Sequence, residues 1–489
     1  MTMNTHESLT VTTAPSQKIG IVMLPLMLVL FISTLDQTIV ATALGRISQA
    51  LGDQAAAPWI ATAYLLTSAV TTLIFGKLGD IIGRKPVLQA SIAIFVVGSL
   101  LCALAPTMLW LAIFRALQGL GGGGLSSLSM TVVGELVPAR ERARYQAVLG
   151  VVPALAVILG PLLGGLIVDH WAWPWIFFIN LPIGVVAFLL IAARLHLPRH
   201  HDCRRTLDVG GSVLASFFTA SFLLIVVEGG QRFAWKSPPI LALSLVAVAS
   251  LAAYVRVEHR APEPITPLHL FKNRIFVISS LLFSLSTAAL FVGMLFVPLL
   301  LQNVFGLTAF AAGSSIVPLL LGLIVATMVT GGVISRTGRY KIFPIVGAVL
   351  TSAGIYAFSR VDTGTSMCAM LIWLSLMGMG IGCFIQVTVL AGQNAVEHKD
   401  LGVATGALNF FKTLGGAAGS AVFGAVLAAA YAQLPGPGPE HAVHAFQQVF
   451  LWSMPLMGVA LILAILLPEK PLSEEAMQIA EGKIEVPEY

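Results

Sequence analysis

The sequence predicts an all-α integral membrane protein with fourteen spanning helices, arranged as two six-helix halves plus two inserted helices. Of the 489 residues, 57% are hydrophobic and only 10% are charged, whereas about a quarter of a typical soluble domain is charged. Long apolar runs recur along the whole chain, which indicates helices, because a β-barrel would show short alternating segments. Two motifs also occur twice, once in each half of the chain.

The apolar runs follow one another from residue 19 almost to the C-terminus. We expect each run to form one helix, because about 20 apolar residues are needed to cross the hydrocarbon core. The predicted spans are 19–44, 57–78, 87–105, 108–134, 143–168, 174–193, 208–228, 238–256, 274–302, 309–334, 342–359, 365–391, 401–430 and 446–467. The residues before the first span are polar, so no cleavable signal peptide is expected.

The repeated motifs divide the chain into two halves. Gly83–Arg84 matches Gly338–Arg339 at an offset of 255 residues, and the glycine-rich segment 118–124 matches 377–383 at an offset of 259. Internal duplication is typical of transporter folds. We predict a cytoplasmic N-terminal tail, an N-terminal half, two inserted helices, a C-terminal half and a cytoplasmic C-terminal tail, with bounds 1–18, 19–198, 199–262, 263–468 and 469–489.

The basic residues indicate the orientation of the helices. If both termini lie on one side, the segments on that side contain 21 of the 27 lysines and arginines, and the opposite segments contain 4. Cytoplasmic loops carry the excess of basic residues in membrane proteins. We therefore expect both termini to be cytoplasmic.

Five segments resemble motifs of the major facilitator superfamily. "GKLGDIIGRKPVL" (76–88) resembles its loop motif, "LAIFRALQG" (111–119) its fourth-helix motif and "ILGPLLGG" (158–165) its antiporter motif. "LDQTIVATAL" (35–44) and "WPWIFFINLPIG" (173–184) are similar to the fourteen-helix drug:proton antiporter branch, the EmrB/QacA subfamily. The sequence departs from these patterns at several positions, for example at Pro174, where the branch usually has arginine.

The loop motif is expected to form a cytoplasmic gate. Its glycines, Gly76 and Gly83, permit close helix approach and a tight turn. Asp80 can cap a neighbouring helix or pair with Arg84, and such contacts would break and reform as the two halves rock. Arg84 and Lys85 also mark the cytoplasmic side, but that role does not explain Asp80.

The antiporter motif places small residues four apart and a proline on the fifth span. Small residues at this spacing let two helix backbones pack closely, and proline bends a helix. The motif residues are Gly160, Pro161, Gly164 and Gly165. A seam that prevents leak during exchange and ordinary close packing both fit this pattern.

Asp36 and Arg115 are charged residues inside apolar spans. Both lie about 10–12 Å below the outer ends of their helices, at about 1.5 Å per residue. The family fold places the first and fourth helices side by side, and intramembrane charges usually face one another. We expect a proton-coupling pair. A permanent structural ion pair, or an aspartate bonded to Ser33 and Thr38, is the alternative.

Other polar and aromatic residues of the spans are candidates for the substrate cavity. With Asp36 they are Gln118, Asn180, Gln386, Asn409, Phe410 and Lys412. Lys412 lies near mid-membrane, where it could neutralise a half-helix, repel protons or extend along a water-filled cavity. No nucleotide-binding loop or hydrolase motif occurs, so we expect neither an enzyme nor ATP as the energy source.

The resemblance implies a multidrug:proton antiporter of the bacterial inner (plasma) membrane. It would export amphipathic or cationic drug-like molecules by alternating access, with the proton gradient as energy source and neither cofactor nor metal. Its partners would be the lipid bilayer, protons and small-molecule substrates, without nucleic acid, and the protein would be a monomer. The alternatives are an exporter of one metabolite, lipid or siderophore, and an uncoupled uniporter or channel.

Overall fold

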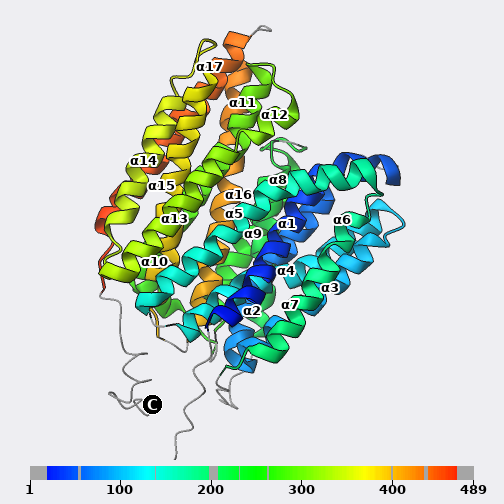
Figure 1. The fold of residues 1–489 in the computed structure, drawn as a ribbon, viewed down its shortest axis with the longest axis vertical. Coiled ribbons are helices and arrows are strands. Elements are labelled where there is room, and N and C mark those ends of the chain that lie inside the picture. The colour runs from blue at the N-terminus through cyan, green and yellow to red at the C-terminus, as the bar shows by residue number, and fades with distance from the viewer. Residues whose placement is uncertain are drawn as a thin grey trace, which may run out of the picture.

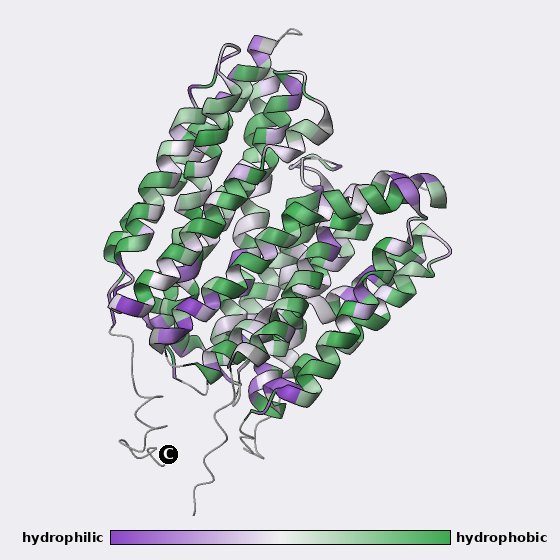
Figure 2. Ribbon diagram, viewed as in Figure 1, coloured by the Kyte–Doolittle hydropathy of each residue, from purple (hydrophilic) through white to green (hydrophobic). Residues whose placement is uncertain are grey.

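The computed structural model describes residues 19–52, 57–137, 139–197, 208–230, 232–261, 264–397, 400–433 and 439–470. The predicted tails, 1–18 and most of 469–489, lie outside the described residues. The described part is a bundle of long helices (Figure 1). Hydrophobic residues predominate along the helices, and hydrophilic residues gather near their ends (Figure 2).

The N-terminal half consists of seven helical segments that correspond to six predicted spans. They are α1 (Ile19–Leu51), α2 (Ala57–Ile82), α3 (Arg84–Ala103), α4 (Met108–Leu136), α5 (Ala139–His170), α6 (Trp175–Phe178) and α7 (Asn180–Arg194). The short α6 leads directly into α7, so the pair accounts for one span. At the start of α4 the hydroxyl of Thr107 accepts a hydrogen bond from the backbone nitrogen of Trp110, which satisfies one of the free donors at a helix start.

Two inserted helices separate the halves, and ten helical segments follow them in the described chain. The inserted helices are α8 (Val209–Glu228) and α9 (Pro238–Glu258). After them come η1 (Leu268–Lys272), α10 (Arg274–Phe291), η2 (Val292–Phe296), α11 (Val297–Asn303), α12 (Ala309–Ser314), α13 (Val317–Thr337), α14 (Ile342–Phe358), α15 (Met367–Asn394), α16 (Leu401–Gln433) and α17 (Pro439–Leu466). η2 is a π-helical turn that precedes Pro298, whose ring cannot fit a regular α-helical turn.

Twelve of the helices in the described residues are long and apolar enough to span a membrane. This number is lower than the predicted fourteen, which is therefore not confirmed. Two predicted spans account for the difference. α14 is apolar but has only 17 residues. α4 has 29 residues, but its centre is rich in glycine and serine, and Arg115 lies about two turns after its start.

The two halves repeat one local arrangement. In the N-terminal half α4 packs against α2 and α3, and in the C-terminal half α15 packs against α13 and α14. Gly83 and Gly338, which occupy matching sequence positions, both have positive φ angles, 104° and 70°. Glycine adopts this conformation without the steric cost that a side chain adds. The turns therefore agree with the duplication seen in the sequence.

The halves are in contact mainly at the end of the bundle where the described chain begins and ends. α2 packs against α16 and α5 against α13, and the two groups of helices diverge toward the other end (Figure 1). In α16 every residue from 401 to 408 is buried, whereas several of the following residues are partly exposed. We call the closed end the terminal end.

Candidate functional site

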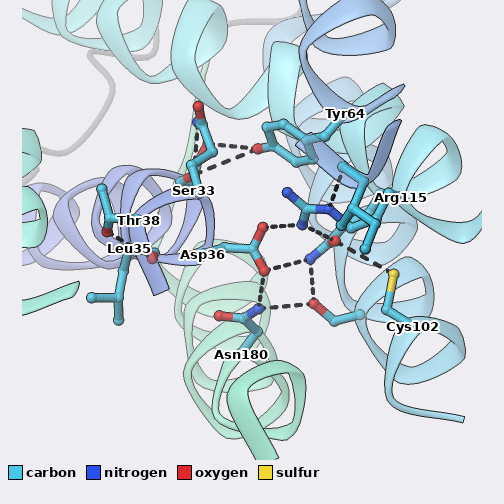
Figure 3. A network of polar contacts seen from close by, with 12 residues as sticks. Ser33, Leu35, Asp36, Thr38, Tyr64, Cys102, Arg115 and Asn180 are labelled. Atoms are coloured by element: carbon cyan, nitrogen blue, oxygen red, sulfur yellow. Dashed lines mark hydrogen bonds and ion pairs between the residues drawn. The ribbon is translucent and has the colours of Figure 1, made fainter. Parts of the chain in front are cut away.

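Asp36 lies at the centre of a buried polar cluster. It has no exposed surface. Its carboxylate forms an ion pair with Arg115 of α4 (Figure 3). Its Oδ1 atom accepts hydrogen bonds from Gln118 Nε2 at 2.9 Å and from Asn180 Nδ2 at 2.7 Å. Three donors from two other helices thus surround one carboxylate, which satisfies a charge that is costly to bury.

Arg115 is held as firmly as its partner. Its side chain is 1% exposed, and its Nε atom donates to the backbone oxygen of Ile60 at 3.3 Å. The guanidinium carbon lies 4.4 Å from the ring centre of Tyr64 on α2, a geometry that favours a cation–π interaction. The predicted pairing of Asp36 and Arg115 is therefore direct in this structure and does not need a bridging water.

A second layer of hydroxyl groups supports the cluster. Ser99 Oγ on α3 accepts hydrogen bonds from Gln118 Nε2 at 2.6 Å and from Asn180 Nδ2 at 3.0 Å. The Tyr64 hydroxyl lies 3.3 Å from Ser33 Oγ. The cluster therefore joins five helices of the N-terminal half, and sequence reasoning missed Ser99 and Tyr64. Gln118 and Asn180 were predicted as polar candidates, and the position of Gln118 three residues after Arg115 places these two residues on one helix face.

The alternative partners of Asp36 lie elsewhere. The Ser33 hydroxyl contacts Tyr64, as described above. Thr38 Oγ1 donates to the backbone oxygen of Leu35 at 2.9 Å, within α1 itself. The hydroxyl groups of Ser33 and Thr38 therefore do not hydrogen-bond to Asp36 in this structure.

The loop motif joins the two halves at the terminal end. Asp80 Oδ2 accepts a hydrogen bond from the backbone nitrogen of Val403, near the start of α16, at 3.0 Å. Its Oδ1 atom lies 3.1 Å from a guanidinium nitrogen of Arg84, whose other nitrogen lies 2.6 Å from Glu135 Oε2. Asp80 thus makes both contacts that the sequence suggested, and Glu135 is an additional member that the sequence analysis missed.

The glycines of the loop motif permit this contact. A methyl group added at Gly76 would lie 2.8 Å from the backbone oxygen of Gly402, so α2 and α16 approach each other backbone to backbone. Gly83 turns the chain between α2 and α3 with a φ of 104°. Lys85 Nζ donates to the backbone oxygen of Ala192, near the end of α7, at 2.8 Å. Lys85 therefore fastens the motif within its own half.

The antiporter motif packs α5 against α1. A methyl group at Gly160 would overlap the side chain of Thr38, and one at Gly164 would lie 3.0 Å from Thr42 Oγ1. Gly165 faces open space, and Pro161 lies inside α5. The seam lies within the N-terminal half, beside the α1 segment that carries Asp36. It can fix the position of that segment, but it does not join the two halves.

The residues proposed for the substrate cavity make contacts in several parts of the structure. Gln118 and Asn180 belong to the Asp36 cluster. Gln386 donates to the backbone oxygen of Ala143 and so joins the halves. The remaining three lie on α16: Asn409 bonds its own helix through the oxygen of Thr405 at 3.0 Å, Phe410 is 8% exposed, and Lys412 Nζ lies 5.7 Å from the ring centre of Phe283.

An apolar groove lies apart from the residues predicted to bind substrate. A groove of about 340 Å³ between α10, α16 and α17 is lined by apolar residues, and it contains none of the residues predicted to bind substrate. No group of three histidine, cysteine, aspartate or glutamate residues that could hold a metal ion occurs in the described parts of the chain.

Comparisons with known proteins agree with this architecture. The model of the Major Facilitator Superfamily matches residues 26–420. An uncharacterized MFS-type transporter of Mycobacterium tuberculosis is 36% identical over 471 residues, which cover 91% of this chain and 68% of that protein. The multidrug transporter protein MdtP of Bacillus subtilis is 35% identical over 402 residues, which cover 82% of this chain and 74% of that protein.

A solved structure shows the same fold. The proton:xylose symporter XylE, bound to 6-bromo-6-deoxy-D-glucose, superposes with a TM-score of 0.62 at 15% identity and covers 94% of this chain and 98% of its own. Together with the family match and the twelve apolar helices, this similarity identifies the class of protein. The chain belongs to the Major Facilitator Superfamily, and it is a multi-pass membrane transporter of small molecules and, as predicted, not an enzyme.

Proposed function

We propose that this transporter exports amphipathic small molecules in exchange for protons and that Asp36 carries the proton. The observation that carries the proposal is the fully buried Asp36–Arg115 pair, surrounded by Gln118 and Asn180. Ionisable residues inside membrane spans usually serve function. Relatives named as a multidrug transporter protein and an efflux pump, from Bacillus subtilis and Dothistroma septosporum, support export of such molecules.

Protonation of Asp36 gives a physical means of coupling. A neutral carboxyl group no longer balances the charge of Arg115. An unbalanced buried charge is unfavourable by roughly several kcal/mol. The helices carrying the two residues then favour an arrangement in which Arg115 finds solvent or another partner. Proton loading thereby shifts the equilibrium between two conformations, because the proton binds one of them better.

The contact of Asp80 with α16 would control the terminal end. The carboxylate lies at the start of a long helix, where the backbone N–H groups and the helix dipole favour a negative charge. This contact must break before the halves can separate at that end. Its loss and recovery would accompany each cycle of alternating access.

The finer topology belongs to the same proposal. α4 is enclosed by α2 and α3, and α14 packs against α15 and α17, so both have the neighbours of a spanning helix. With them the protein has the fourteen helices of the EmrB/QacA branch. The distribution of basic residues supports cytoplasmic termini, and the bacterial relatives support the inner membrane.

The energy source and the assembly state complete the proposal. The proton gradient drives transport, no cofactor takes part, and the monomer is the working unit. A dedicated exporter of one metabolite, lipid or siderophore would use the same coupling machinery. A broad inhibition profile among chemically unrelated amphipathic compounds supports the multidrug function, and competition by a single compound class supports the dedicated exporter.

The proposal can be tested with purified protein in liposomes. The lumen is made acidic and contains a pH-sensitive dye, and a panel of amphipathic compounds of different charge is added outside. Antiport predicts that a substrate raises the luminal pH, because protons leave as the compound enters through inside-out molecules. If no compound in a broad panel moves protons, multidrug:proton exchange is wrong.

A further inference from the structure

Lys412 lies on α16, just after the buried segment 401–408 that forms part of the closed terminal end. The residues from 401 to 408 are buried, and Lys412, one helical turn after Leu408, is partly buried. Thr405, Leu408 and Lys412 share one helix face, because residues three or four apart are neighbours on a helix. Thr405 Oγ1 accepts a hydrogen bond from Gln393 on α15, and Leu408 lies against Gly392. Lys412 therefore faces the protein interior and not the lipid.

The ammonium group of Lys412 has an aromatic neighbour but no counter-ion. Its nitrogen lies 5.7 Å from the ring centre of Phe283 on α10. Within the described residues it forms neither a hydrogen bond nor an ion pair. Ser279, four residues before Phe283 on the same helix, has a fully buried hydroxyl group with no hydrogen-bond partner among those residues. Within the described residues, Lys412 thus has an aromatic neighbour and no ion-pair partner, and the unpartnered hydroxyl group of Ser279 lies one helical turn before that neighbour.

The charges in the middle of the helices add to this imbalance. Asp36 and Arg115 neutralise each other, so Lys412 leaves a net charge of +1 in the membrane interior. The other charged residues of the described helices lie within about two turns of a helix end. A charge in this low-dielectric region is unfavourable unless an opposite charge or water accompanies it. In the described helices Asp36 is the one interior carboxylate that could attract a cation, and it already has three donors.

We infer that Lys412 binds the anionic group of transported molecules, so that the substrates are amphipathic anions or zwitterions with a carboxylate or sulfonate. The ammonium group would pair with the anion, the ring of Phe283 would contact the apolar body, and the Ser279 hydroxyl would supply a hydrogen bond. This inference rests on the proposed export of amphipathic molecules, and it replaces the preference for cations that the family resemblance implies.

Two dyes that differ in one charge provide the test. Tetramethylrhodamine carries a carboxylate, and its methyl ester does not, while the chromophore is the same. Binding to the purified full-length protein in detergent is followed by fluorescence anisotropy, without a proton gradient. We expect the wild type to bind the carboxylate dye more tightly. In Lys412→Gln the affinity for the carboxylate dye falls by roughly thirtyfold or more, as expected for the loss of one desolvated ion pair. The affinity for the ester does not change.

Two variants control for effects on folding. Lys412→Arg keeps the charge and is expected to retain the preference for the carboxylate dye. Lys236→Gln removes an exposed lysine between α8 and α9 and is expected to bind both dyes as the wild type does. The inference is overturned if the wild type does not prefer the carboxylate dye, or if Lys412→Gln weakens both dyes by the same factor.

The binding test is independent of the test of antiport. Binding at equilibrium needs no coupled transport, so a failed anion preference leaves proton exchange standing. Conversely, a wild type that binds the carboxylate dye but moves no protons with any compound contradicts the proposed exchange and supports the anion site alone.

Discussion

The carboxylate of Asp80 in the N-terminal half lies 3.0 Å from the backbone nitrogen of Val403 in the C-terminal half. The two residues are 323 positions apart, and their contact closes the terminal end where α2 meets α16. A side chain of one half therefore caps a long helix of the other. This single hydrogen bond links the electrostatics of the loop motif to the relative position of the two halves.

Neutralising Asp80 should open the terminal end. Asp80→Asn keeps the size of the side chain but removes the charge that favours the helix start, an effect of about 1 kcal/mol. The population that is open at this end should rise roughly fivefold. Spin labels at Arg144 on α5 and Thr337 on α13, both exposed, measure the separation of the halves. Asp362→Asn, in an exposed loop, is the control, and an unchanged distance distribution in Asp80→Asn would contradict the gate.

The close approach of α2 and α16 predicts a steric effect at Gly76. In Gly76→Ala the new methyl group would lie 2.8 Å from the backbone oxygen of Gly402, and backbone cannot move aside as a flexible side chain can. We expect the terminal end to stay open and the initial transport rate to fall about tenfold or more. Gly332→Ala on α13 is the matched control, because nothing lies within 4 Å of the added group. Equal rates in the two variants would rule out a tight closed contact.

The antiporter motif contains its own matched pair of glycines. In Gly160→Ala the added group overlaps Thr38, whereas in Gly165→Ala it meets nothing within 4 Å. Overpacking of this kind typically costs about 1–3 kcal/mol, so Gly160→Ala should lower the melting temperature by several degrees and Gly165→Ala should not. Thermal unfolding in detergent measures both. Similar melting temperatures would mean that the α1–α5 seam is looser than the structure shows.

The Asp36 cluster predicts energetic coupling between its members. Asn180→Ala removes a donor to the carboxylate and should destabilise the protein by about 1–3 kcal/mol. In an Asp36→Asn background the same change should destabilise the protein less, because Asn180 no longer donates to a charged carboxylate. A double-mutant cycle on thermal unfolding gives the coupling energy, which we expect to be about 1 kcal/mol. Additive losses would show that Asn180 acts independently of Asp36.

Matching depth, charge and the family resemblance together predicted the central contacts. Asp36 and Arg115 were paired because both lie at a similar distance from the outer helix ends and because the resemblance places the first and fourth helices side by side. Asp80 was expected to cap a helix or to pair with Arg84 because an acidic side chain is favoured at a helix start and beside an arginine. The fourteen predicted segments are all helical in the structure. Only twelve helices of the described residues are long and apolar enough to span a membrane, whereas fourteen were predicted.

The remaining partners depend on how the helices rotate when they pack. Ser99 and Tyr64 enter the Asp36 cluster from α3 and α2, and nothing in their neighbouring sequence distinguishes them from other small or aromatic residues of a span. Gln386 was expected in the cavity, but it joins the halves through Ala143. A polar side chain in an apolar environment needs a hydrogen-bond partner. The sequence does not specify which residue provides it.

The central claim is that Asp36 couples proton movement to substrate movement. The most direct measurement compares two modes of transport by Asp36→Asn in proteoliposomes. One is exchange of labelled for unlabelled substrate without a pH gradient, and the other is uphill accumulation driven by a pH gradient. We predict that the variant retains exchange but loses accumulation, because the substrate can still pass while the proton has no carrier. Accumulation equal to that of the wild type would contradict the claim and make the Asp36–Arg115 pair structural.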